Sequence, residues 1–184
     1  MRIIGGKYKG RQIRAPKGLP VRPTTDQAKE GLFNILRHRM LLNGARVLDC
    51  FAGTGNMSYE FLSRGAASVT AVDRHPGCLR FIQTQFRSME GGTARTVKSD
   101  IGRFLKKDDG PYDIVFMDPP YAMEGLEELV AVCFRRNLLA EEGWVILEHT
   151  SRDDYSSSPW FAEVRKYGSS SFSIFCTPDH SEDA

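Results

Sequence analysis

The sequence predicts an α/β fold, in which a mostly parallel β-sheet carries helices on both faces and ends in an antiparallel hairpin. Three observations support this prediction: apolar, β-branched runs alternate with helix-like segments, a glycine turn follows one run, and acidic residues end several others. Strands that alternate with helices pair in parallel. The carboxyl ends of parallel strands share one edge of the sheet, where ligands bind.

The N-terminal segment is strongly basic and predicts a small β-hairpin or extended arm. Its two halves, residues 2–4 and 9–13, are joined through Gly5 and Gly6. Such an arm suits phosphate contacts on a folded RNA, although an ordinary solvated basic surface is the alternative. We therefore expect an arm over residues 1–23 and a catalytic domain over residues 24–184. The candidate RNA-binding residues are Arg2, Lys7, Lys9, Arg11, Arg14 and Arg22.

A helix is expected after the arm. Thr24 is the predicted cap, with Gln27 as its partner at the third helical position. The apolar spacing predicts a buried face made of Ala28, Leu32, Ile35 and Leu36. This helix would dock the arm beside the catalytic domain.

A glycine turn follows the first apolar strand, at residues 47–55 (VLDCFAGTG). Gly53 and Gly55 allow a tight turn and close approach of the backbone to a ligand, and Ser58 takes the small third position of the G-x-G-x-x-G pattern. Residues 56–64 then predict a helix that stops at Gly65. Alone the pattern is weak, but it is typical of a cofactor loop.

Acidic residues at strand ends indicate an adenosine-type cofactor. Asp73 ends the strand 68–72 and lies 18 residues past Gly55, close to the ~20 expected for an acid that binds ribose. Asp49 would repel a pyrophosphate but accept an ammonium, which favours S-adenosylmethionine over NAD. Asp100 is placed to accept a hydrogen bond from the adenine amine. Singly, Asp73 and Asp100 are more often helix caps or turn residues.

The later elements continue the alternation of strands and helices. The expected helices cover residues 75–90 and 125–136, and the expected strands cover residues 96–99, 112–117 and 144–148. Two aromatic and β-branched runs, at residues 161–167 and 172–177, predict the hairpin at one edge of the sheet.

The tetrapeptide Asp118-Pro119-Pro120-Tyr121 follows the buried strand 112–117. Two prolines stiffen the backbone and supply no N–H, so the segment offers acceptors only. The tyrosine ring beside them suits a planar base with an exocyclic amine, and the corresponding chemistry is methylation at nitrogen. The alternative is a Pro-Pro turn that merely ends a strand.

The sequence resembles the RsmD-type guanine-N2 methyltransferases of small-subunit ribosomal RNA, over roughly residues 1–150. The glycine loop and the Asp-Pro-Pro-Tyr motif are shared with many amino-methyltransferases, whereas two N-terminal segments are narrower signatures. The matching segments are residues 2–11 (RIIGGKYKGR), 19–26 (LPVRPTTD), 32–34 (LFN), 49–55 (DCFAGTG), 62–66 (LSRGA) and 118–121 (DPPY).

This resemblance implies a Rossmann-like, S-adenosylmethionine-dependent fold and methyl transfer to the exocyclic N2 of a guanine in 16S ribosomal RNA. Asp49 and Phe51 would line the methionine end of the cofactor, Asp73 the ribose and Asp100 the adenine. The catalytic residues implied are Asp118, Pro119, Pro120 and Tyr121. The full set expected at the cofactor is Asp49, Phe51, Ala52, Gly53, Thr54, Gly55, Asp73, Arg74, Asp100 and Ile101.

The composition agrees with a compact cytoplasmic enzyme. The chain has 184 residues, 41% of them hydrophobic and 26% charged, and no apolar stretch approaches the ~20 residues of a membrane span. Its four cysteines are widely spaced without nearby histidines, so neither a metal site nor a disulfide framework is expected. We expect a monomer without a metal.

Two rival functions remain. An adenine methyltransferase acting on DNA would usually need an added target-recognition region, for which the chain leaves little room. A domain that binds RNA without catalysis would need a broken site, yet both motifs are intact. The serine-rich stretches 156–158 and 169–171 depart from the family pattern.

Overall fold

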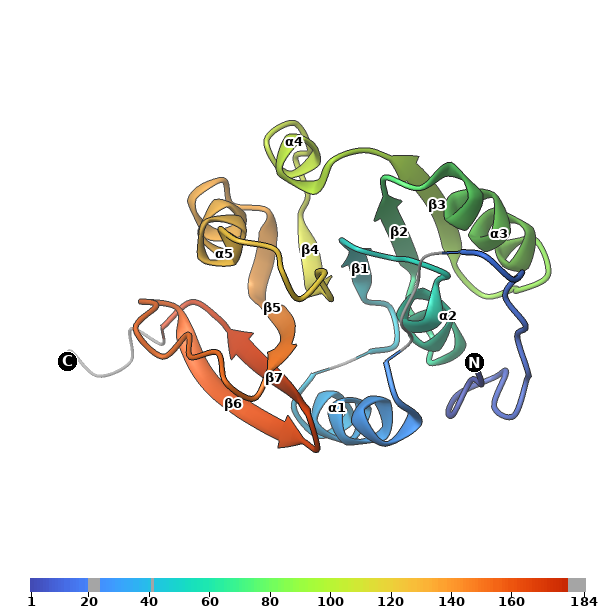
Figure 1. The fold of residues 1–184 in the computed structure, drawn as a ribbon, viewed down its shortest axis with the longest axis horizontal. Coiled ribbons are helices and arrows are strands. Elements are labelled where there is room, and N and C mark those ends of the chain that lie inside the picture. The colour runs from blue at the N-terminus through green and yellow to red at the C-terminus, as the bar shows by residue number, and fades with distance from the viewer. Residues whose placement is uncertain (20–23, 41, 179–184) are drawn as a thin grey trace.

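The computed structural model describes residues 1–19, 24–40 and 42–178, and it confirms the predicted α/β fold (Figure 1). Within these ranges one seven-stranded sheet has the order β3-β2-β1-β4-β5-β7-β6. The strands are β1 (Arg46–Asp49), β2 (Ser68–Asp73), β3 (Thr93–Lys98), β4 (Tyr112–Met117), β5 (Leu139–Thr150), β6 (Phe161–Tyr167) and β7 (Ser170–Phe175). The helices are α1 (Asp26–Arg39), α2 (Asn56–Ser63), α3 (Pro76–Phe86), α4 (Ile101–Leu105) and α5 (Leu126–Arg135).

The first five strands run parallel, and the direction in which the sheet grows reverses at β1. The chain adds β2 and β3 on one side of β1, then crosses to place β4 and β5 on the other side. The predicted hairpin of β6 and β7 follows, with β7 antiparallel to both β5 and β6. A reversal of this kind leaves a crevice between the loops that follow β1 and β4.

The two faces of the sheet bury separate apolar clusters. Helices α1, α2 and α3 cover one face, where Phe33, Phe61 and Phe116 are fully or almost fully buried. Helices α4 and α5 cover the other face, around Leu48 and Val115 (Figure 1). The central strands β1, β2 and β4 therefore alternate their side chains between two apolar layers, which is why they read as largely apolar runs.

Helix α1 begins one residue later than predicted. The Thr25 hydroxyl, and not that of Thr24, accepts the hydrogen bond from the Ala28 N–H, at 3.2 Å. Thr24 donates instead to the buried carboxylate of Glu148. The expected buried face is also wrong at Ile35, which is half-buried, whereas Lys29 and Phe33 are fully buried.

Several element boundaries differ from the prediction. Helix α3 stops at Phe86 rather than residue 90, because residues 88 and 90 contact the N-terminal arm. The short helix α4 was not predicted; Asp100 caps it by accepting from the Arg103 N–H. Strand β3 begins earlier, β5 is longer at both ends, and β7 begins within the second serine-rich stretch.

The N-terminal arm forms a hairpin that is packed onto the domain. An isolated antiparallel bridge joins Arg2 to Gln12, and Ile3 and Ile13 are buried in the core beside α1 and α2. Gly6 has a φ of 74°, and a Cβ there would lie 1.8 Å from the Ser63 carbonyl oxygen. The glycine therefore lets the arm backbone lie directly against the end of α2. The division into an arm and a catalytic domain stays a prediction.

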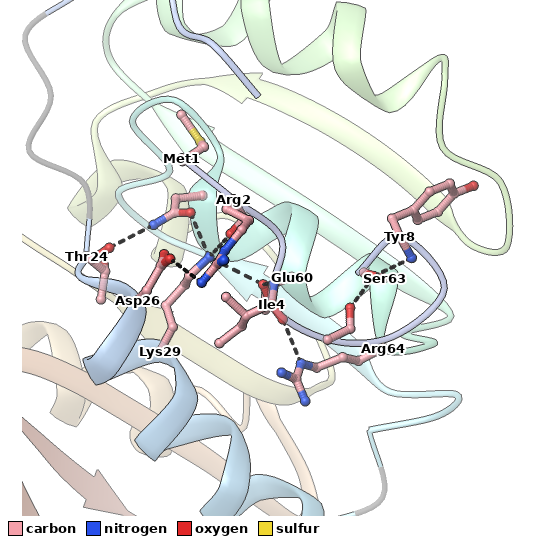
Figure 2. Close-up of polar contacts among 12 residues, drawn as sticks. Met1, Arg2, Ile4, Tyr8, Thr24, Asp26, Lys29, Glu60, Ser63 and Arg64 are labelled. Carbon is pink, nitrogen blue, oxygen red and sulfur yellow. Dashed lines mark hydrogen bonds and ion pairs between the residues drawn. The ribbon is translucent and has the colours of Figure 1, made fainter. Parts of the chain in front are cut away.

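A buried ion pair joins the arm to α1 and α2 (Figure 2). The Nζ of Lys29 donates to Glu60 Oε2 at 3.3 Å and to the Arg2 carbonyl at 2.7 Å, and neither charged side chain is exposed. Glu60 also accepts from the Ile4 N–H and from Arg64. Burial lowers the pKa of Lys29, an effect that the Glu60 carboxylate opposes.

We expect Glu60→Leu to lower the free energy of unfolding by about 3–5 kcal/mol, because it leaves a buried ammonium without its carboxylate. The matched control is Asp26→Ala, which breaks the half-exposed pair between Arg2 and Asp26 and should cost at most about 1 kcal/mol. Urea unfolding followed by circular dichroism measures both. Equal, small losses would show that the buried pair does not anchor the arm.

Candidate active site

A cavity of about 400 Å³ lies at the carboxyl ends of the parallel strands, where the sheet order reverses. The loops after β1, β2, β3 and β4 form most of its wall. The expected residues that line it are Asp49, Phe51, Ala52, Gly53, Thr54, Asp73, Arg74, Asp100, Ile101, Asp118, Pro119, Pro120 and Tyr121. Gly55, also expected at the cofactor, is not among the lining residues.

Gly55 instead allows the loop to turn tightly into α2. It has a φ of 84° and begins α2, and a Cβ there would lie 2.6 Å from the Tyr59 ring. Gly53, in contrast, presents its N–H to Asp73 Oδ2 at 2.8 Å. Asp73 also accepts from the His75 N–H at 2.7 Å. The acid at the end of β2 therefore holds the glycine loop in place while it lines the cavity.

Asp49 is the most deeply buried acid of the site, with 1% of its surface exposed. Ser58, the small residue of the glycine pattern, donates to Asp49 Oδ2 at 2.6 Å. Burial raises the pKa of Asp49 to about 7, although the Ser58 hydrogen bond acts in the opposite direction. A cation bound in the cavity would favour the charged carboxylate.

Asp100 and Arg74 form an ion pair across the loops after β3 and β2. The hydrogen bond from Arg74 and the capping bond from the Arg103 N–H hold the pKa of Asp100 below its ordinary value. The Asp100 carboxylate, which is expected to contact the adenine, therefore already binds a guanidinium and the first turn of α4. Ile101, next in the chain, is buried and lines the cavity.

The Asp-Pro-Pro-Tyr segment leaves β4 directly at the cavity. Asp118 is half-buried, whereas Tyr121 is 49% exposed and is one of the few large hydrophobic side chains on the surface. A ring placed at the wall of a cavity yet open to solvent is suited to stack on a flat group. The turn therefore combines buried acceptors with an accessible aromatic face.

Several lining residues were not predicted from the sequence. They come from segments outside both motifs and are Thr24, Thr25, Asn56, Met123, Glu148 and Ser170. Asn56 holds the Thr24 carbonyl through its amide at 3.1 Å and accepts from Lys29. Of these residues, Glu148 could have been identified from the sequence, because it is a polar residue at the end of an apolar strand. The same pattern identified Asp73 and Asp118.

The predicted RNA-binding residues that the structure describes lie outside this cavity. Arg2 pairs with Asp26, Lys7 with Glu90, and Arg11 donates to Ser88. Within the described ranges, the exposed side chains of Lys9 and Arg14 form no ion pair. Arg22 lies outside the described residues.

Two further features concern only the residues that the structure describes. No cluster of three or more histidine, cysteine or acidic side chains there could hold a metal ion. None of the helices found there has both the length and the apolar character to cross a bilayer.

The comparisons with known proteins agree on one family. The family model described as "Conserved hypothetical protein 95" matches residues 1–176. Ribosomal RNA small subunit methyltransferase D of Escherichia coli K12 is 38% identical over 145 residues, which cover 79% of this chain and 69% of that protein.

Solved structures show the same fold. The structure of yhhF from Escherichia coli, provisionally named a methyltransferase, has a TM-score of 0.82, 33% identity and coverage of 95% and 96% of the two chains. The Thermus thermophilus 16S rRNA N2 G1207 methyltransferase RsmC has a TM-score of 0.67 at 21% identity, covering 86% of this chain and 45% of that one. The family match and the E. coli relative show that this chain belongs to the RsmD-type methyltransferase family.

Proposed function

We propose that this protein methylates small-subunit ribosomal RNA, using S-adenosylmethionine to modify the exocyclic N2 of a guanine. The observation that carries the proposal is the rigid acceptor turn at Asp118–Tyr121, which opens into an acidic cavity at the switch point of the sheet. The E. coli relative is named a ribosomal RNA methyltransferase. The RsmC structure, of the same fold, holds AdoMet and guanosine.

The charge of the cavity supports this choice of cofactor. Its acidic lining residues are Asp49, Asp73, Asp100, Asp118 and Glu148, and among the described residues that line it Arg74 is the one arginine or lysine. An anionic pyrophosphate would be repelled, whereas a sulfonium and an ammonium would be attracted. S-adenosylmethionine supplies an electrophilic methyl group on that sulfonium. Asp49 would hold the ammonium, and Asp73 the ribose hydroxyls.

The acceptor turn would orient the nucleophile. The lone pair of a guanine N2 amine is delocalised into the ring, so the Asp118 carboxylate and the Pro119 carbonyl would aim its hydrogens and stabilise the positive charge that develops on nitrogen. The amine proton can leave to solvent after transfer, so Asp118 need not be a strong base. The guanine must leave its stack, and the exposed Tyr121 ring offsets part of that cost.

The rival functions lack a comparable observation. Methylation of adenine in DNA would use the same turn, but no described segment forms an additional domain that could recognise a DNA target. A domain that only binds RNA would not require the buried acids of the cavity. The proposed substrate places the enzyme in the cytoplasm, a setting that the four free thiols also fit.

Asp118→Ala should reduce the rate of methyl transfer by about 10²-fold or more, because one oriented electrostatic group is lost. Tyr121→Phe should stay active, and Tyr121→Ala should lose stacking worth about 1–3 kcal/mol. Single-turnover assays on undermethylated small subunits, with mass spectrometry of the product nucleoside, measure both. Wild-type rates for Asp118→Ala would refute the mechanism, and a product other than N2-methylguanine would refute the substrate.

The buried carboxylate of Asp49 predicts a pH dependence of cofactor binding. Its pKa of about 7 must fall when an ammonium binds beside it, so binding below that pH releases a proton. Affinity for S-adenosylhomocysteine should therefore weaken as the pH falls below about 7, by up to about tenfold per pH unit. Asp49→Asn should bind more weakly and without this dependence, as calorimetry would show. The same pH slope in both proteins would assign the proton to another group.

The arm should contribute to RNA affinity through Lys9 and Arg14, whose side chains form no ion pair with the described residues. Replacing Lys9 and Arg14 with glutamine should lower RNA affinity and reduce the slope of log affinity against log salt by about 1 per residue. The matched control replaces Lys7 and Arg11, which already contact Glu90 and Ser88. Filter binding at several salt concentrations distinguishes them, and affinity for S-adenosylhomocysteine should not change. An unaltered slope would leave the arm an ordinary basic surface.

A further inference from the structure

Glu148 is a buried carboxylate in the part of the cavity next to the acceptor turn. It lies near the end of β5, and 4% of its surface is exposed. The last paired residues of β4 and β5 are Met117 and Leu147. Glu148 follows Leu147 as Asp118 follows Met117, so the two residues lie side by side on adjacent strands. Both line the same cavity.

Glu148 lies apart from the three acids that are expected to bind the cofactor. Asp49 and Asp73 end β1 and β2, and Asp100 follows β3. Their carboxylates bind Ser58, Gly53 and Arg74, respectively. Glu148 instead lies between β4 and β7, where it pairs in register with Phe172. The carboxylate on this side of the cavity is thus placed beside the turn proposed to hold the base.

The start of α1 holds the Glu148 carboxylate in position. The Thr24 hydroxyl donates to Glu148 Oε2 at 3.1 Å, from a residue that is itself buried at 8% exposure. A carboxylate can accept about four hydrogen bonds, so this contact is compatible with donors from a ligand.

We propose that Glu148 determines which base is methylated by accepting a hydrogen bond from N1–H of the target guanine. The Watson–Crick edge of guanine presents N1–H next to the N2 amine, so one carboxylate and the Asp118 turn would contact adjacent donors. Adenine presents an acceptor nitrogen at N1, which the carboxylate would repel. Glu148 is then a specificity residue that reads the flipped base, and the proposal rests on the function proposed above.

The decisive substrate is 2-aminopurine, which keeps the N2 amine but lacks O6 and carries an acceptor at N1, so the change of preference in Glu148→Gln carries the test. The methylated guanine is first located by mass spectrometry of the wild-type product. Small subunits are then reconstituted with ribosomal RNA ligated to carry either guanine or 2-aminopurine at that position. Single-turnover rates on both substrates are compared for the wild type, Glu148→Gln and the control Thr24→Val.

The wild type should prefer guanine by about 10²-fold or more, since a site built for a donor rejects an analogue that lacks it. Glu148→Gln can donate to the acceptor at N1, so it should lose rate on guanine and reduce this preference by at least about tenfold. Thr24→Val removes the hydroxyl that positions Glu148 but leaves the carboxylate itself, so it should lower the preference less than Glu148→Gln does. Unchanged affinity of Glu148→Gln for S-adenosylhomocysteine would show an intact fold and cofactor site.

Each result of this experiment has one interpretation. Equal losses on both substrates for Glu148→Gln would overturn the assignment and leave Glu148 a structural partner of Thr24. A wild type that methylates 2-aminopurine as fast as guanine would overturn it as well. A wild type that forms no N2-methylguanine at all would instead reject the proposed function itself.

Discussion

The buried pair of Lys29 and Glu60 is the interaction on which the arrangement of the N-terminal half depends. It connects the arm, α1 and α2, three segments that meet on one face of the sheet (Figure 2). Asn56 extends the same network from Lys29 to the Thr24 carbonyl, and both Asn56 and Thr24 line the cavity. A charge buried in the core thus helps to fix two walls of the candidate active site. Because a lone buried charge is so costly, these segments are held together as a unit.

The parts of the site that could be predicted are those carried by local motifs. The glycine loop and the Asp-Pro-Pro-Tyr turn each follow a strand directly, so parallel pairing alone brings them to one edge of the sheet. Glu148 and Thr24 could not be placed in this way, because their contact joins residues 124 positions apart. The docking of Ile3 and Ile13 in the core depends likewise on long-range packing, which a basic N-terminal sequence does not reveal.

The boundaries that differ from the prediction have physical causes in side-chain contacts. The predicted strand starts at residue 172, after the serine-rich stretch 169–171, yet Ser170 and Ser171 already begin the buried strand β7. Within the same strand, the Ser173 hydroxyl forms a hydrogen bond with His149 at 2.8 Å. Small hydroxyl side chains fit between packed strands where larger polar residues would not. Helix α4 is too short for a periodic pattern, and its cap, Asp100, was assigned to a ligand. An acid at the end of a strand can thus serve as a helix cap as well as a ligand contact, and the sequence alone does not distinguish the two roles.

The excess of carboxylates in the cavity has a consequence for turnover. In the proposed reaction, transfer of the methyl group would convert a sulfonium into a neutral thioether, so the cofactor would lose one positive charge while the carboxylates around it stay in place. The attraction that draws the reactant into the cavity is therefore weaker for the product by one charge–charge interaction. The proposed transfer would thus itself weaken the binding of the spent cofactor and favour its exchange for a fresh molecule.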